Sequence, residues 1–169
     1  MVIKEVKEKN SFNINKNNVS EKEQVLEIAK KDIIAFGQLF MPEDFMKSTP
    51  APYHYELSDL LLDDTKKRNC IILPRGHSKS TLAKAALMYH LYFNPEGKKE
   101  FIAWVAEEQS QAIDHIKYIQ NHIEMNPALN YYFGDLQGSK WTEKEFTTSK
   151  GDRIIAKGTS QRLRGRSQL

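Results

Sequence analysis

The chain has a single cysteine, Cys70, among its 169 residues. One cysteine excludes an internal disulfide framework and a cysteine-based metal site, and it fits a reducing cytoplasm. The apolar runs are far shorter than the roughly 20 residues that span a membrane. The N-terminus has no hydrophobic stretch typical of an export signal, and no internal repeat is found. We therefore expect a cytoplasmic protein that makes no membrane contact.

The net charge of +3 is too small to predict a nucleic-acid partner from the whole chain. An apolar content of 40% and two tryptophans favour a globular domain with a core of its own. The distribution of charge is more informative, because residues 150–169 hold six basic residues and one acid. A run of this kind is usually a solvated tail, but it could also contact phosphate groups.

The N-terminal part divides into a flexible arm and the start of the ordered chain. Residues 1–19 are rich in Lys, Glu and Asn and have few large apolar side chains. Ser20 and Glu23 have the spacing of a capping box, and apolar residues then recur at helical spacing until Met41. Pro42 is expected to end this helix. The sequence thus predicts an arm over 1–19 and an ordered domain over 20–169.

The stretch at 69–81 passes from a short apolar run through a turn to an alanine-rich segment, which predicts strand, loop and helix. A helix N-terminus presents unpaired N–H groups and the positive end of its dipole, which suits a phosphate. Lys79 would add a positive charge at the outer phosphates, and the Ser80 hydroxyl would be a Mg²⁺ ligand. This pattern predicts a nucleoside triphosphate site.

The loop departs from the strict glycine-rich phosphate-binding pattern at two positions. That pattern, aligned on Lys79 and Ser80, requires glycines where this chain has Leu73 and Ser78. The alternative is an ordinary connection between a strand and a helix, with a lysine that faces solvent.

The element before this loop is predicted to be a Pro-bounded amphipathic helix over 50–62. In many nucleotide-driven motors the corresponding element stacks on the adenine base. Tyr53, His54 and Tyr55 are therefore candidates for a base-binding wall. The alternative is that Tyr55 packs with the leucines and that His54 is a surface residue.

The residues after the loop predict a layered α/β fold. The helix is expected to run to Phe93, followed by a buried strand over 100–106 and a helix that ends at Asn126. This order favours a parallel sheet flanked by helices. Residues 131–134 and 140–142 are interpreted as aromatic turns, and 145–158 as a β-hairpin.

Taken together, these segments resemble the large subunit of tailed-bacteriophage terminase from about Phe36 to Leu169. The resemblance is carried by 73–81 (LPRGHSKST), 102–108 (IAWVAEE) and the Gly- and Arg-rich end at 158–166. The family packages DNA with an N-terminal P-loop ATPase domain and cuts it with a C-terminal nuclease domain. Its loops accommodate small residues such as Ser78 before the lysine. The resemblance implies an incomplete P-loop NTPase-type sheet, without the nuclease domain.

The resemblance also implies roles for single residues. Arg75 would contact or sense the γ-phosphate, and Arg164 would be supplied to the nucleotide of a neighbouring subunit. An arginine placed on the transferring phosphoryl group is worth as much as ~10³–10⁵ in rate. Arg162 and Arg166 are close enough to take that role instead, and all three could contact DNA phosphate. The candidate nucleotide-binding residues are Tyr53, His54, Arg75, Gly76, His77, Ser78, Lys79, Ser80 and Thr81.

By the family pattern, the acids that hold Mg²⁺ and orient water should follow Arg164 within about a dozen residues, but the sequence stops at Leu169. We therefore expect this chain to bind ATP and Mg²⁺ with negligible turnover. The implied partners are double-stranded DNA, the portal protein, the small terminase subunit and further copies in a ring on the procapsid, in the host cytoplasm. The alternatives are another P-loop translocase of helicase type and a non-catalytic nucleic-acid-binding fragment.

Overall fold

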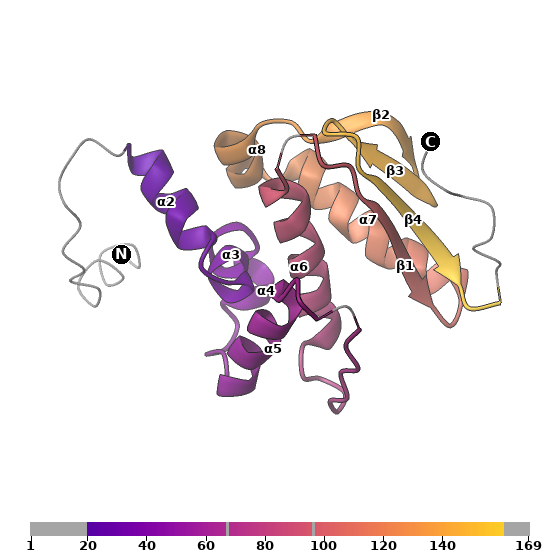
Figure 1. The fold of residues 1–169 in the computed structure, drawn as a ribbon, viewed down its shortest axis with the longest axis horizontal. Helices are drawn as coiled ribbons and strands as arrows, with labels where there is room; N and C mark the ends of the chain where they lie inside the picture. Colours follow the sequence, from indigo (N-terminus) through magenta and orange to yellow (C-terminus); the bar gives the residue numbers. More distant parts are fainter. Residues whose placement is uncertain (1–19, 67, 96, 161–169) are drawn as a thin grey trace.

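The computed structural model describes residues 20–66, 68–95 and 97–160. The predicted arm at 1–19 and the arginines at 162, 164 and 166 lie outside these residues. Helices predominate in the first half of the described chain and strands in the second (Figure 1). In chain order, the elements are α2 (Glu21–Ala29), α3 (Ile33–Phe40), α4 (Pro42–Phe45), α5 (Pro52–Leu62), α6 (Lys79–Phe93), β1 (Phe101–Ala106), α7 (Gln109–Met125), α8 (Pro127–Phe133), β2 (Gln137–Thr142), β3 (Glu145–Thr148) and β4 (Arg153–Gly158).

In the described part of the chain, four strands form one mixed sheet in the order β1-β4-β3-β2. β1 and β4 are parallel, whereas β3 is antiparallel to both β4 and β2. The predicted α/β layering and the hairpin at 145–158 are confirmed, but the sheet is mixed, not parallel throughout. The connections explain this: short turns join β2 to β3 and β3 to β4, which makes these neighbours antiparallel, whereas β1 is joined to its parallel neighbour β4 through the long segment that contains both helices α7 and α8 and the strands β2 and β3.

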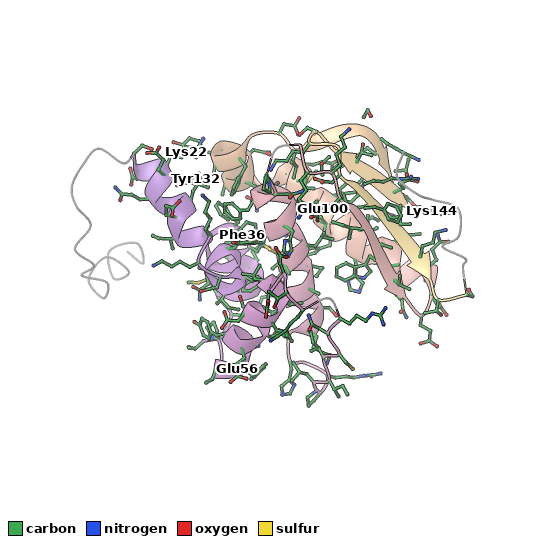
Figure 2. The ribbon with its side chains drawn as sticks, viewed as in Figure 1. Lys22, Phe36, Glu56, Glu100, Tyr132 and Lys144 are labelled. Carbon is green, nitrogen blue, oxygen red and sulfur yellow. The ribbon has the colours of Figure 1, made fainter. Side chains whose placement is uncertain are left out.

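The helix α7 lies between the sheet and the other helices. α7 packs on β1 and β4, and α6 packs on α3, α5 and α7. Phe36 of α3 lies at the centre of the helical layer (Figure 2), with its ring centroid 5.8 Å from that of Tyr89 and 6.1 Å from that of Phe93 on α6. This aromatic contact holds α6 against the N-terminal helices, so the segment that precedes α6 is attached to a rigid support. No helix in the described ranges is long and apolar enough to cross a membrane.

The N-terminal helix predicted over 20–40 is two helices. The capping box at its start is confirmed, since the Ser20 side chain accepts from the Glu23 N–H and the Glu23 side chain accepts from the Ser20 N–H. The first helix ends at Ala29. Asp32 then caps the start of α3, because its side chain accepts a hydrogen bond from the Ala35 N–H at 2.7 Å. An aspartate that caps a new helix competes with continuation of the previous one.

The strand predicted over 69–73 is not found. Residues 68–74 have no regular secondary structure, and the Ile72 side chain is 88% exposed. An apolar run becomes a strand only where a neighbouring strand accepts and donates its backbone hydrogen bonds. In the described part of the chain β4 is the neighbour of β1, and β1 forms the edge of the sheet.

Two segments interpreted as turns are regular elements. Residues 127–133 form α8, which Asn126 caps by accepting from the N–H groups of Ala128 and Leu129. Trp141 lies in β2 opposite Phe146 of β3, with ring centroids 4.8 Å apart. A cross-strand aromatic pair stabilises a strand that the residues of β2 alone do not predict.

Two charged side chains attach the hairpin turn to the end of α6 and to the start of β1. Lys150 Nζ donates to the carbonyl oxygens of Leu91, Tyr92 and Asn94 at 2.7–3.2 Å. These carbonyls lie at the C-terminus of α6, where backbone acceptors lack helical partners and a cation is favourable. Asp152 is fully buried in the same turn and accepts from the Glu100 N–H at 3.0 Å.

Glu145 of β3 has a buried carboxylate that lies between two cations. Glu145 is 8% exposed, with Lys140 Nζ at 2.9 Å and Arg153 Nε at 2.6 Å from its carboxylate oxygens. Burial raises the pKa of the Glu145 carboxyl, but the hydrogen bonds and charges of Lys140 and Arg153 together outweigh it, so the pKa lies below its usual value.

This arrangement predicts a loss of stability in acid. Because the pKa of Glu145 is lower in the folded than in the unfolded chain, its contribution is present above the unfolded value of about 4.3 and is lost as pH falls through the folded-state pKa. Urea unfolding between pH 7 and pH 3 should therefore show a smaller decrease in unfolding free energy for Glu145→Gln than for the wild type. If the unfolding free energies of the two proteins decreased equally between pH 7 and pH 3, this expectation would be contradicted.

Candidate nucleotide site

The loop before α6 makes a tight turn with two residues in left-handed conformations. Gly76 has φ of 80° and Ser78, the residue before the first helical position, has φ of 55°. A left-handed conformation favours glycine at position 76 and is strained for serine, so the surroundings must hold Ser78 in place. The Ser78 side chain does not cap the helix. The first turn of α6 therefore starts with backbone N–H groups that its own N-cap side chain leaves available.

Lys79 is the first residue of α6, and its side chain folds back over the loop. Its Nζ donates to the carbonyl oxygens of Leu73 and Pro74, the second at 2.7 Å. The lysine is half-buried, so its ammonium group lies over the loop and not in open solvent. A phosphate bound at the helix N-terminus would exchange these neutral acceptors for a charged one, which forms the stronger hydrogen bond.

Ser80 lies next to Lys79 beside a cavity of about 240 Å³. The cavity lies between α5, α6, the segment 68–74 and β1, and its lining has no acidic side chain. Its lining residues are Leu57, Leu61, Ile71, Lys79, Ser80, Ala83 and Trp104. The contribution of Ile71 and Trp104 was not predicted. No local sequence pattern predicts that these two residues line one cavity, because Ile71 lies in the segment 68–74 and Trp104 in β1.

The helix α5 contacts the loop through aromatic rings. The ring centroids of Tyr53 and His77 are 5.8 Å apart, and His77 Nδ1 lies 3.1 Å from the carbonyl oxygen of Arg75. Figure 1 shows the loop at the same end of the molecule as α5. The structure thus brings Tyr53, predicted to bind the base, to the loop predicted to bind phosphate.

The remaining predicted residues lie around the same loop, with different exposure. Arg75, Gly76, Ser78 and Ser80 are exposed, whereas Thr81 is half-buried in the first turn of α6. His54 is half-buried, which differs from the surface position that was its alternative. Arg164 lies outside the described residues.

One further side chain near the loop was not predicted. Asp44 of α4 lines a small cavity together with His54, Ser78 and Thr81. The Tyr118 hydroxyl donates to Asp44, and Lys84 Nζ lies 3.5 Å from the centroid of the Tyr118 ring. Burial lowers the pKa of Lys84, an effect that the charge of Asp44 opposes. Lys84 is therefore bound to α7 and not to the loop, although it follows Lys79 by little more than one helical turn.

The residues around the loop could contribute a ligand to a Mg²⁺ ion that is also bound by phosphate, but they could not hold the ion by themselves. The described residues contain no group of three or more His, Cys, Asp or Glu side chains that could hold a metal ion. Mg²⁺ commonly takes one or two protein oxygens and completes its octahedron with phosphate and water. The exposed Ser80 hydroxyl could supply such a protein ligand, and the phosphates would supply others.

Comparisons with known proteins add no identification to this geometry. No family model matches the chain, and no curated protein matches it significantly.

Proposed function

We propose that this chain is the ATP-binding part of a DNA-packaging motor of the terminase large-subunit type. The observation that carries the proposal is the junction at 74–79. There a loop with two left-handed residues leads directly into a 15-residue helix, whose first side chain is a lysine that lies over the loop. Available amide donors, the helix dipole and the ammonium group together favour a phosphate chain.

The rest of the site supports a nucleotide in preference to phosphate alone. The Tyr53 ring lies beside the loop through its contact with His77, and an aromatic face is a suitable surface for a base. In the proposed complex, Lys79 leaves its carbonyl partners for the outer phosphates, and Ser80 contributes an oxygen to Mg²⁺. Mg²⁺ would neutralise phosphate charge and hold the phosphates in place.

Binding, and not turnover, is the activity proposed for the described residues. Hydrolysis requires a residue that positions water as well as groups that stabilise the phosphoryl charge. The cavity beside Lys79 and Ser80 offers cationic, hydroxyl and apolar groups but no carboxylate.

DNA as the second ligand rests on the basic residues of 150–169. In the structure, two of the six are engaged within the fold, because Lys150 binds the end of α6 and Arg153 binds Glu145. A DNA contact from this stretch would therefore come from Lys157 and from the arginines outside the described residues. Such a contact should weaken steeply as salt rises.

The proposal is tested by titrating the purified chain with MgATP in a calorimeter at two salt concentrations. We expect saturable binding with one site per chain. If a folded chain binds no MgATP, but binds duplex DNA with a steep salt dependence that ATP does not change, the proposal is wrong. The basic stretch would then define a nucleic-acid-binding protein.

A further inference from the structure

Asn126 joins three helices through its side-chain amide. Its Oδ1 accepts from the N–H groups of Ala128 and Leu129, at 3.0 and 3.1 Å, and thereby caps the start of α8. Its Nδ2 donates to the carbonyl oxygen of Phe40, the last residue of α3, at 2.6 Å. The same Nδ2 lies 3.2 Å from Nδ1 of His122, in the last turn of α7. We call these contacts of Asn126 with α3, α7 and α8 the helix joint.

The contacts fix both the orientation of the Asn126 amide and the protonation of the His122 ring. The amide oxygen must face the two N–H groups of α8, so the amide nitrogen faces His122. Because an amide nitrogen only donates, His122 Nδ1 must accept with its lone pair, and the proton of the ring is on Nε2. The helix joint is therefore formed by a neutral imidazole.

Protonation of His122 would set two donors against each other. The imidazolium ion carries a proton on both ring nitrogens, so Nδ1 could no longer accept from Asn126. Rotation of the amide by 180° would not relieve the conflict. It would place the amide nitrogen against the N–H groups of α8 and the amide oxygen against the Phe40 carbonyl. Neither orientation of Asn126 satisfies all its neighbours when His122 is charged.

The surroundings of His122 leave it open to protonation but disfavour the charged form. The ring is half-buried and lines a cavity of about 590 Å³. The titratable and charged groups that surround it are Glu43, Asp44 and Lys47 of α4, Lys84 of α6 and Tyr118 of α7. Burial lowers the pKa of the His122 imidazole, the charges of Asp44 and Glu43 oppose this change, and the charge of Lys84 adds to it.

We propose that the helix joint is a pH-sensitive switch at the start of α8. A neutral His122 holds Asn126 in place, whereas a protonated His122 displaces it and releases the first turn of the helix. Asn126, Pro127 and Ala128 line the same cavity as His122, so this release alters one wall of the cavity. The inference goes beyond the proposed function and does not depend on it.

The effect is confined to the start of α8, because the other end is held by aromatic packing. The ring centroid of Phe133 lies 5.3 Å from that of Phe40 and 4.7 Å from that of Tyr92. These contacts do not involve Asn126 and are independent of pH in this range. The amides of Ala128 and Leu129 should therefore respond to the charge of His122 more strongly than the rest of α8.

The first test is an NMR titration of the histidine rings in the full chain between pH 8 and pH 4.5. In the wild type we expect the His122 proton on Nε2 at pH 8 and a pKa below the usual value of about 6.5. In Asn126→Asp a carboxylate can still cap α8 but accepts from Nδ1–H, so the pKa of His122 should rise by at least about one pH unit. Asn130→Asp is the matched control, because it adds the same charge at an exposed position one turn along α8.

Three results of this titration would overturn the proposal. The first is a wild-type His122 with its proton on Nδ1 or with a pKa at or above the usual value. The second is a His122 pKa that does not rise in Asn126→Asp. The third is an equal rise in Asn126→Asp and Asn130→Asp, because added charge alone would then explain it. The wild-type result needs no variant, so the proposal stays testable if Asn126→Asp does not fold.

The second test is amide hydrogen exchange of α8, given as protection relative to the intrinsic rate so that the ordinary pH dependence cancels. It compares pH 8 with one pH unit below the measured pKa of His122. We expect the protection of Ala128 and Leu129 to fall about three- to tenfold in the wild type, the ratio that the loss of one hydrogen bond gives. In His122→Gln it should stay constant, because the glutamine oxygen can accept from Asn126 and does not titrate.

Protection of these two amides that is independent of pH in a folded wild type would overturn the proposal, because the ring would then turn away without displacing Asn126. An equal fall in the wild type and in His122→Gln would also overturn it, because another group would then be responsible. Thermal melts at both pH values show that each protein is folded.

Discussion

Replacement of Lys79 by alanine is expected to weaken MgATP binding roughly 10- to 150-fold, the range that a hydrogen bond to a charged group contributes. Lys79 is the cation that lies over the loop, with Nζ on the carbonyls of Leu73 and Pro74. Without it, the helix N-terminus still attracts phosphate, but the positive charge that compensates the outer phosphates is gone. The measurement is calorimetric titration of both proteins with MgATP.

The unfolding free energy of Lys79→Ala should differ little from that of the wild type. Pro74 is exposed and Leu73 is half-buried, so water can replace the ammonium group at least in part. Lys117→Ala is the matched control: this exposed lysine of α7 pairs with Glu143 at 3.1 Å and does not line the cavity beside the loop. We expect it to bind MgATP as the wild type does. Equal affinity of Lys79→Ala and Lys117→Ala would contradict the assigned role.

The largest loss of stability is expected for Asp152→Ala, at about 3 kcal/mol, because a buried polar cluster loses its charged acceptor. Asp152 is fully buried, and its carboxylate accepts from the Glu100 N–H at 3.0 Å, the Thr148 hydroxyl at 2.8 Å and Asn94 Nδ2 at 3.4 Å. It thereby joins the hairpin turn, the end of α6 and the start of β1. Urea unfolding at pH 7 measures the change.

Asp152→Asn separates the loss of the acceptors from the loss of the charge. Asparagine keeps one side-chain oxygen, so it can still accept from one of these donors, and we expect a loss of stability smaller than that of the alanine variant. A decrease below about 1 kcal/mol for Asp152→Ala would be the size of one ordinary hydrogen bond. It would show that the cluster is not a structural centre of the fold.

The parts of the fold that the sequence predicts are those fixed by local patterns. The start and end of α6, the strand at 101–106 and the hairpin at 145–158 agree with apolar periodicity, Pro and Gly signals, and turn residues. The capping box at Ser20 is likewise a local signal. For these elements the local preferences and the tertiary structure agree.

The parts that could not be predicted depend on neighbours distant in the sequence. Ile72 lies in an apolar run typical of a strand, but whether a strand forms depends on an adjacent strand. Trp141 belongs to β2 because Phe146 packs across from it. In the candidate site, the loop could be predicted from Lys79 and Ser80, whereas the cavity between His54, Asp44 and Ser78 requires three segments to meet.

The central claim is that the loop at 74–81 holds the phosphates of a nucleotide. Backbone amide NMR spectra of the ¹⁵N-labelled chain, recorded during a titration with MgATP, test it most directly. We expect the largest shifts at Gly76–Thr81, with smaller ones at Tyr53, and no such shifts in Lys79→Ala. Shifts centred on the strands, or none at saturating MgATP in a folded chain, would contradict the claim.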